Sequence, residues 1–297
     1  MEARRIVKIG GSFYVALPKT WVLDRVGENG VVAVTVGEDG SLHIIPFREE
    51  KNEEKKVIRL RCGDDLYRSI ISAYLRGYEV IEVSTSPECR DEVMRVAERV
   101  KQLLLGLELV GEETGLVTLQ CFIRPDYDLY SIVQRMSSIT LAMMKLVFQA
   151  FERTDVSTTD KILAMEDIID RLYFLAVRII RSRVSDPSVP SSEKLRLVDI
   201  RVIVRNLENI GDLLELLIRN SPCQCRIDPG MYEALSRFQR SVISIALGGE
   251  DSSRSEILAL YRNLIERLEN NGKGLPTEVY KNLENIIVLL KDILDLS

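Results

Sequence analysis

The 297-residue sequence is poor in residues on which several functional classes depend. It contains one histidine, His43, which excludes a histidine-rich metal site and a histidine-based proton relay. No apolar run approaches the roughly 20 residues that a bilayer-spanning helix needs. The charged N-terminus is not followed by an apolar segment of the signal type. We therefore expect a cytoplasmic protein without membrane insertion.

Cysteine is also scarce, and the five cysteines form an odd, scattered set that does not resemble the disulfide framework of a secreted protein: Cys62, Cys89, Cys121, Cys223 and Cys225. Reduced thiols are the expected state. The Cys-x-Cys pair at 223 and 225 could bind a soft metal or respond to oxidation, but it lacks the paired spacing of a structural zinc site. The sequence favours ordinary loop cysteines at these positions.

The chain has no excess of positive charge and no recognisable catalytic motif. Its formal net charge of -5 argues against a surface coated with basic residues for nucleic acid, although it leaves room for a local basic surface. No nucleophile stands beside a base, and no glycine-rich phosphate loop is present. We therefore expect a protein that is not an enzyme.

The first 48 residues read as short strands separated by turns, at positions 5–9, 13–17, 31–36 and 41–46. So small a module cannot bury a large core by itself, and oligomerisation is the simplest source of partner surface. A charged run at 48–56 without apolar periodicity reads as a linker.

In a second region, 56–124, the apolar residues follow the period of a strand in some segments and that of a helix in others. Strands are predicted at 57–61, 79–83, 107–110 and 117–122, and helices at 65–76 and 87–105. Alternating strands and helices predict a small α/β module.

From residue 126 onward the sequence predicts helices nearly throughout, at 129–153, 157–184, 193–219, 229–247, 252–270 and 277–296. Short breaks between long helices produce antiparallel neighbours. The expected architecture is a pair of three-helix bundles, formed by repeats 126–221 and 228–297.

One phrase occurs in both repeats. Asn-Leu-Glu-Asn-Ile stands at 206–210 and again at 282–286. In the first copy, Glu208 and Asp212 are four residues apart, which places both carboxylates on one helix face. The second copy keeps Glu284 but has Val288 in place of the aspartate. Any function that uses both copies must be asymmetric.

A second acidic pair lies on the preceding helix, where Glu166 and Asp170 fall in the middle of an apolar stripe. Two carboxylates in that position cost several kcal/mol unless they are neutralised or bind a cation. Spacing leaves two explanations open. Carboxylates of adjacent helices converge on a hard or borderline cation, or they are neutralised by an arginine, with Arg135, Arg201 and Arg205 as candidates.

These acidic motifs resemble those of PhoU-like proteins, whose fold is two symmetric three-helix bundles. The resemblance covers roughly residues 126–296 and includes Leu-Glu-Asn-Ile-Gly-Asp at 207–212. It implies a regulator of phosphate uptake, with a phosphate transporter or its signalling machinery as partner. It also implies iron, zinc or another divalent ion on a complete first cluster of Glu166, Asp170, Glu208 and Asp212. A second cluster is doubtful because of Val288.

The N-terminal module resembles the SpoVT/AbrB-type domain, in which hairpins of two chains interlock into one barrel that binds DNA. The resemblance rests on Lys8-Ile9-Gly10-Gly11-Ser12, on Val15-Ala16-Leu17-Pro18-Lys19, and on a later turn closed by Ile44-Ile45-Pro46. It implies a homodimer. The combination of this module with a PhoU-like domain resembles phosphate regulators of archaeal type. The candidate DNA contacts are Arg4, Arg5, Lys8, Ser12, Tyr14 and Lys19, which would be doubled in a dimer.

The acidic residues of this module nearly cancel its basic charge, so a module that only dimerises is the competing explanation. The sequence thus predicts a dimeric, DNA-binding transcriptional regulator of phosphate uptake. The alternative is a protein-interaction adaptor that contacts a transporter or signalling partner and binds no DNA.

Overall fold

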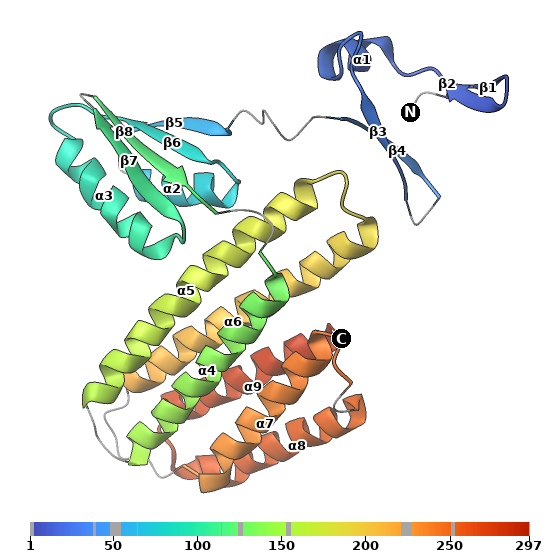
Figure 1. The fold of residues 1–297 in the computed structure, drawn as a ribbon. Coiled ribbons are helices and arrows are strands. Elements are labelled where there is room, and N and C mark those ends of the chain that lie inside the picture. The colour runs from blue at the N-terminus through green and yellow to red at the C-terminus, as the bar shows by residue number, and fades with distance from the viewer. Residues whose placement is uncertain are drawn as a thin grey trace.

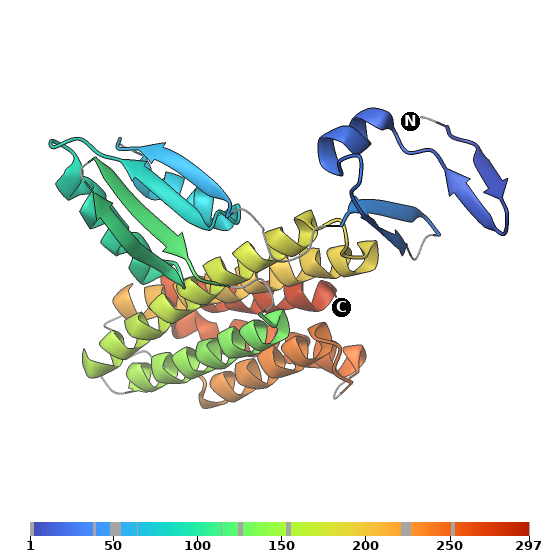
Figure 2. The ribbon, with the colours of Figure 1, turned by 45° about the horizontal axis from the view of Figure 1, so that its top comes forward.

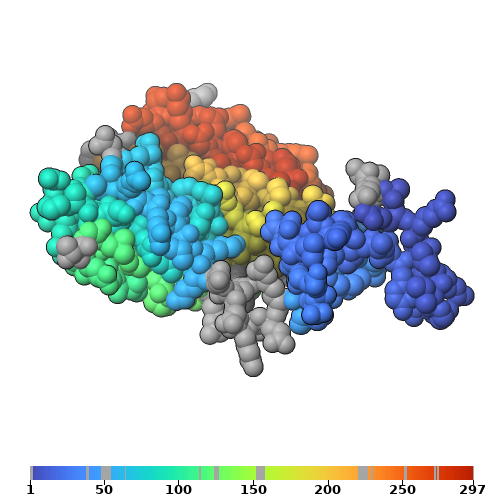
Figure 3. All heavy atoms as spheres, turned by 90° about the horizontal axis from the view of Figure 1, so that it is seen from above, coloured from blue at the N-terminus to red at the C-terminus, as the bar shows by residue number. Residues whose placement is uncertain are grey.

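The computed structural model describes residues 3–37, 40–47, 55–63, 65–113, 115–123, 127–152, 156–220, 227–250 and 253–296. The chain forms an N-terminal β-rich module, an α/β module and a C-terminal helical region (Figure 1). Seen from above, the N-terminal module and the α/β module lie on opposite sides of the molecule (Figure 3).

The N-terminal module consists of two hairpins and one short helix. Strands β1 (Ile6–Ile9) and β2 (Ser12–Val15) pair antiparallel, as do β3 (Val32–Val36) and β4 (Leu42–Pro46). Helix α1 (Lys19–Arg25) joins the hairpins, at a place where the sequence predicted only a turn. The two sheets are separate, so the described part of one chain does not close a barrel. The predicted barrel needs strands from a second chain and stays a prediction.

The described residues of this module bury no side chain completely. The exposed fraction is 70% for Ile6, 71% for Phe13 and 75% for Val36. These are the apolar side chains that a partner chain would cover if the module dimerises as predicted.

The α/β module contains a four-stranded sheet in the order β5-β6-β8-β7. Its strands are β5 (Val57–Arg61), β6 (Val80–Ser84), β7 (Leu107–Glu113) and β8 (Leu116–Cys121). Only β5 and β6 are parallel. Helices α2 (Leu66–Leu75) and α3 (Arg90–Leu103) join this module to the helical region, because both contact α5 (Val156–Ser185) (Figure 2).

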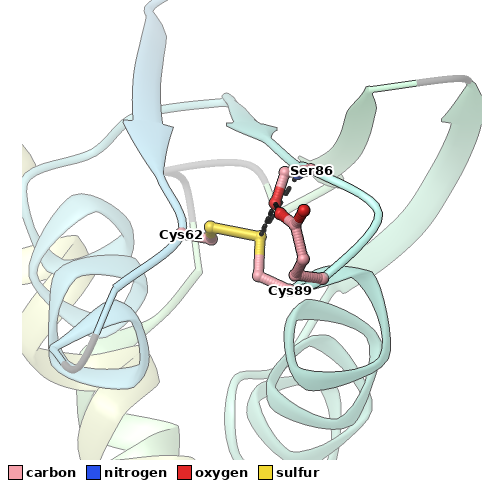
Figure 4. Close-up of a disulfide and its surroundings, with 4 residues drawn as sticks. Cys62, Ser86 and Cys89 are labelled. Atoms are coloured by element: carbon pink, nitrogen blue, oxygen red, sulfur yellow. Dashed lines mark hydrogen bonds between the residues drawn. A yellow bond between two sulfur atoms is a disulfide. The ribbon is translucent and has the colours of Figure 1, made fainter.

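The expectation that all cysteines are reduced is wrong for one pair. Cys62, directly after β5, forms a disulfide with Cys89, the residue before α3 (Figure 4). Strands β5 and β6 are neighbours, so the loop that follows β6 brings Cys89 beside the end of β5. A sequence separation of 27 residues concealed this proximity. Cys121 is free and buried, whereas Cys223 and Cys225 lie outside the described residues.

The helical region forms two three-helix groups. Helices α4 (Leu129–Glu152), α5 (Val156–Ser185) and α6 (Ser191–Asn220) contact one another, and so do α7 (Pro229–Ala246), α8 (Arg254–Asn271) and α9 (Thr277–Asp295). The groups join through α6 with α9 and α4 with α7, and they share one apolar core. Among the described residues, no helix combines the length and apolar character needed to cross a membrane.

The repeated phrase occupies equivalent positions in the two groups. Leu207 and Ile210 on α6 are fully buried, and so are Leu283 and Ile286 on α9. Helix α6 packs against α9, and the Asn206 side-chain amide of the first copy donates to the carbonyl of Leu289, three residues beyond the second copy, at 3.0 Å. The apolar residues of both copies are therefore part of the shared core of the helical region.

Candidate metal centre

Three carboxylates converge between α5 and α6. Glu166 and Asp170 project from successive turns of α5, and Asp212 projects from α6. One oxygen from each lies within 4.8 Å of the others, and all three side chains are half-buried. The predicted neighbours on adjacent helices therefore do meet at one place.

A glycine lets the two helices come this close. A Cβ atom at Gly211 would lie 3.1 Å from Cδ1 of Ile169, which is tighter than ordinary van der Waals contact. Gly211 precedes Asp212, and Ile169 precedes Asp170. This close contact therefore lies beside the place where the carboxylates face each other.

Glu208, the fourth predicted ligand, is not in the converged group. It is only 8% exposed, and its Oε1 atom accepts a hydrogen bond from Arg205 at 2.8 Å. Its other carboxylate oxygen, Oε2, is buried without a hydrogen-bond partner. An unsatisfied buried carboxylate oxygen is costly, and it leaves one lone-pair site beside the cluster.

Burial, together with the charges of neighbouring carboxylates, raises the pKa of the carboxyl groups in and beside the cluster. Burial, followed by the charge of Asp170, raises the pKa of Glu166 to about 8. Burial and the charge of Asp212 raise the pKa of Asp170 to about 6. Burial and Asp212 raise the pKa of Glu208 to about 7, although Arg205 opposes the shift. Ionisation of the group is therefore unfavourable until a cation compensates it.

The candidate neutralising arginines contact residues beside the three converged carboxylates, although the charge of Arg205 opposes the rise in the pKa of Asp170 and Asp212. Arg205 pairs with Glu208, while Arg201 donates to the Tyr173 hydroxyl at 2.9 Å. Both guanidinium groups lie over the Tyr173 ring. Arg135 lies elsewhere, at a cavity beside the α/β module. Among the described residues, no ion pair to Glu166, Asp170 or Asp212 is found.

The donor set suits a hard cation. Three carboxylate oxygens at this spacing match the ligands that Mg²⁺, Ca²⁺, Mn²⁺ and iron accept. Zinc more often takes histidine or cysteine, and neither residue type belongs to this group. The residues present thus fit a divalent ion held by Glu166, Asp170 and Asp212, with Glu208 beside them.

Residues 133–219 match the PhoU domain family. The match runs from the first turns of α4 to the last turn of α6, so it contains the whole carboxylate cluster. It supports the PhoU-like resemblance and indicates a role in phosphate homeostasis. No curated protein and no solved structure shows significant similarity to the chain.

The described part of the second helical group, which lies outside the PhoU match, contains no equivalent cluster. In its described residues, 227–250 and 253–296, no three acidic, histidine or cysteine side chains come close enough to hold a metal ion. Glu284 is half-buried on α9, and Val288 is 43% exposed.

The six candidate DNA contacts are all exposed, but they do not share one face of the chain. In the β1–β2 hairpin, Lys8 pairs with Phe13, and Ile9 pairs with Ser12. Because alternate residues of a strand face opposite sides, Ser12 and Tyr14 lie on the face opposite Lys8. Arg4 and Arg5 precede β1, and Lys19 begins α1.

Three residues at the carboxylate cluster carried no functional prediction from the sequence. Two of them are acidic, Asp167 and Glu215, and the charges of both raise the pKa of Glu166 and Asp170. The third is Gly211. The signal for Gly211 was available, since a glycine between two helical carboxylates points to close helix packing.

Proposed function

We propose that the protein is a dimeric regulator of phosphate uptake whose PhoU-like region holds a divalent ion and whose N-terminal module binds DNA. The convergence of Glu166, Asp170 and Asp212 within 4.8 Å carries the sensor half of this proposal. The bound ion would neutralise the repulsion that raises their pKa values and would fix α5 against α6.

The metal proposal is tested by element analysis and calorimetric titration of the full-length protein with Mn²⁺ or Mg²⁺. Wild-type protein should bind one ion per chain. Asp212→Asn and Asp170→Asn should each weaken binding by about tenfold or more, because each removes one charged ligand. Asp160→Asn on α5 is the matched control, since Asp160 is exposed and lies outside the cluster. Equal metal content in all four proteins would overturn the metal site.

The DNA half rests on the basic residues of the N-terminal module. A dimer would present two copies of Arg4, Arg5, Lys8 and Lys19, and contacts to phosphates make binding depend on salt. The full chain should bind duplex DNA at low salt, and a chain without its first 50 residues should not. The double variant Lys8→Gln, Lys19→Gln should show a weaker dependence of DNA affinity on salt concentration. Lys145→Gln on α4 should leave that dependence unchanged.

A second candidate function is a protein-interaction adaptor that binds no DNA. Its support is that the candidate DNA contacts lie on different faces of the module, while the apolar side chains of both hairpins are exposed. Absence of DNA binding at low ionic strength, in a protein that still dimerises through this module, would favour the adaptor. The partner would then belong to the phosphate transport or signalling machinery.

A further inference from the structure

A cavity of about 630 Å³ lies between the α/β module and the helical region. The module contributes Leu105 and Gly106 before β7, and Phe122 and Ile123 after β8. The helical region contributes residues from the start of α4 and from the middle of α5, including Leu172 and Leu175. The walls are therefore mostly apolar and come from both regions.

The shape of the module wall depends on Gly106. This residue has φ of +72°, and a Cβ atom there would collide with the side chain of Ile123. At the rim, Phe122 is 59% exposed and Tyr127 is 50% exposed. These two exposed aromatic lining residues provide apolar surface that a ligand could cover.

The two charged residues of the cavity, Asp128 and Arg135, differ in their hydrogen bonding. The Asp128 carboxylate caps the start of α4, because it accepts hydrogen bonds from the backbone amides of Tyr130 and Ser131 and from the Ser131 hydroxyl. The Arg135 guanidinium is exposed, and among the described residues no hydrogen bond or ion pair to it is found. Among its described lining residues, the cavity thus offers one cation, Arg135, beside an apolar interior.

We propose that this cavity binds a small amphipathic anion, with an apolar body between the two regions and one carboxylate or phosphate head group on Arg135. The volume falls in the range of small-molecule sites, which are mainly apolar with a few placed polar groups. The planar guanidinium matches carboxylate and phosphate oxygens in a two-pronged pair. The proposal is independent of the metal and of DNA.

Such a ligand would touch the contact that holds the α/β module on the helices. Tyr74 at the end of α2 donates its hydroxyl to the carbonyl of Leu105, a cavity residue, at 3.0 Å. Arg178, one turn beyond Leu175 on α5, is 6% exposed and donates to the carbonyl of Tyr78 at 3.1 Å. Occupancy would therefore stabilise the module in its docked position.

The test is calorimetric titration of the full-length protein with octanoate, octyl phosphate and octanol. Wild-type protein should bind at least one of the two anions about tenfold or more tightly than octanol. Arg135→Gln should weaken anion binding by about tenfold and leave octanol unchanged, because it removes only the charge pair. Ser131→Trp, at an exposed position that lines the cavity, should weaken all three ligands by filling the entrance.

Lys145→Gln, ten residues further along α4, is the control for a general loss of positive charge. The two anions distinguish a carboxylate ligand from a phosphate ligand. The proposal is overturned if neither anion binds, if octanol binds as tightly as the anions, or if Arg135→Gln weakens binding no more than Lys145→Gln. Unchanged binding in folded Ser131→Trp would place the ligand elsewhere and would also overturn it.

Discussion

Glu166 and Asp170 hold their protons at pH values where exposed carboxyl groups have lost them. A carboxyl whose pKa is raised by folding favours the folded state below its unfolded pKa, and that advantage disappears as the pH rises through the folded pKa. The relevant window runs from about 4 to about 8 for this pair. A bound cation would offset the loss above pH 6.

We expect the metal-free protein to be less stable at pH 8.5 than at pH 5.5, by on the order of 1–2 kcal/mol. This figure is smaller than the pKa shifts alone imply, because solvent screens the half-buried carboxyls. The measurement is denaturant unfolding with a chelator at both pH values. Glu166→Gln should flatten the dependence, and His43→Gln, which changes the only histidine, should preserve it. If the stability of Glu166→Gln changes with pH as much as that of the wild-type protein, other groups cause the pH dependence.

Glu208 shows what residue spacing alone could not reveal. Its position on α6 predicted a fourth ligand, but Arg205, only three residues earlier on the same helix, holds one of its oxygens. Ion pairs at this spacing are common on helix surfaces, so the sequence contained the competing partner. Which partner prevails depends on how far α5 approaches α6, and that distance comes from the tertiary packing.

At the level of helices, Gly211 and Ile169 set the geometry of the cluster. We expect Gly211→Val to force α5 and α6 apart and to weaken divalent ion binding by about tenfold without removing a ligand. Overpacking of this kind typically costs about 1–3 kcal/mol of stability. Calorimetric metal titration and denaturant unfolding measure the two effects.

A second substitution tests whether the effect of Gly211→Val on metal affinity comes from the clash with Ile169. Adding Ile169→Ala to Gly211→Val removes the side chain that the new valine meets, so metal affinity should recover. If the double variant binds metal no better than Gly211→Val alone, the close approach does not control the site.

Arg178 joins the α/β module to the helical region at the C-terminal end of α2. Its guanidinium donates to the carbonyls of Tyr74 and Tyr78 and lies over the Tyr74 ring. We expect Arg178→Met to cost about 1.5–3 kcal/mol, the usual range for hydrogen bonds to a charged group. Hydrogen exchange should show faster opening of α2 than in wild-type protein. Arg181→Met, at an exposed position of α5, should change neither measurement, and equal effects would contradict the docking role.

Most elements were predictable from periodicity, and the failures have identifiable causes. All six long helices and the strands of the α/β module lie within a few residues of the predicted positions. Helix α1 was missed because it is short and follows Pro18, where a turn was expected. Strand β7 extends beyond the predicted end because an irregularity between Leu109 and Gly111 interrupts its alternation. The Cys62–Cys89 bond depends on strand order, which local pattern does not encode.

At the scale of the whole molecule, the exposed apolar side chains of the N-terminal hairpins favour association with a second chain. We expect the protein to be a dimer by light scattering, and Phe13→Asp to convert it to a monomer. Leu195→Asp is the control, because Leu195 is similarly exposed, at 70%, but lies on α6. Dissociation by Leu195→Asp and not by Phe13→Asp would move the interface to the helical region.

The unequal repeats limit how a single chain can respond to ion concentration. The α9 copy of the repeated phrase keeps the buried Leu283 and Ile286, but Val288 stands at the position of Asp212, one of the three carboxylates of the proposed metal site. If the carboxylate cluster of the described residues is the one metal site, as proposed, occupancy of an isolated subunit should follow a simple hyperbola. Any sigmoidal titration curve must then originate from communication between subunits, and a monomeric variant should abolish it.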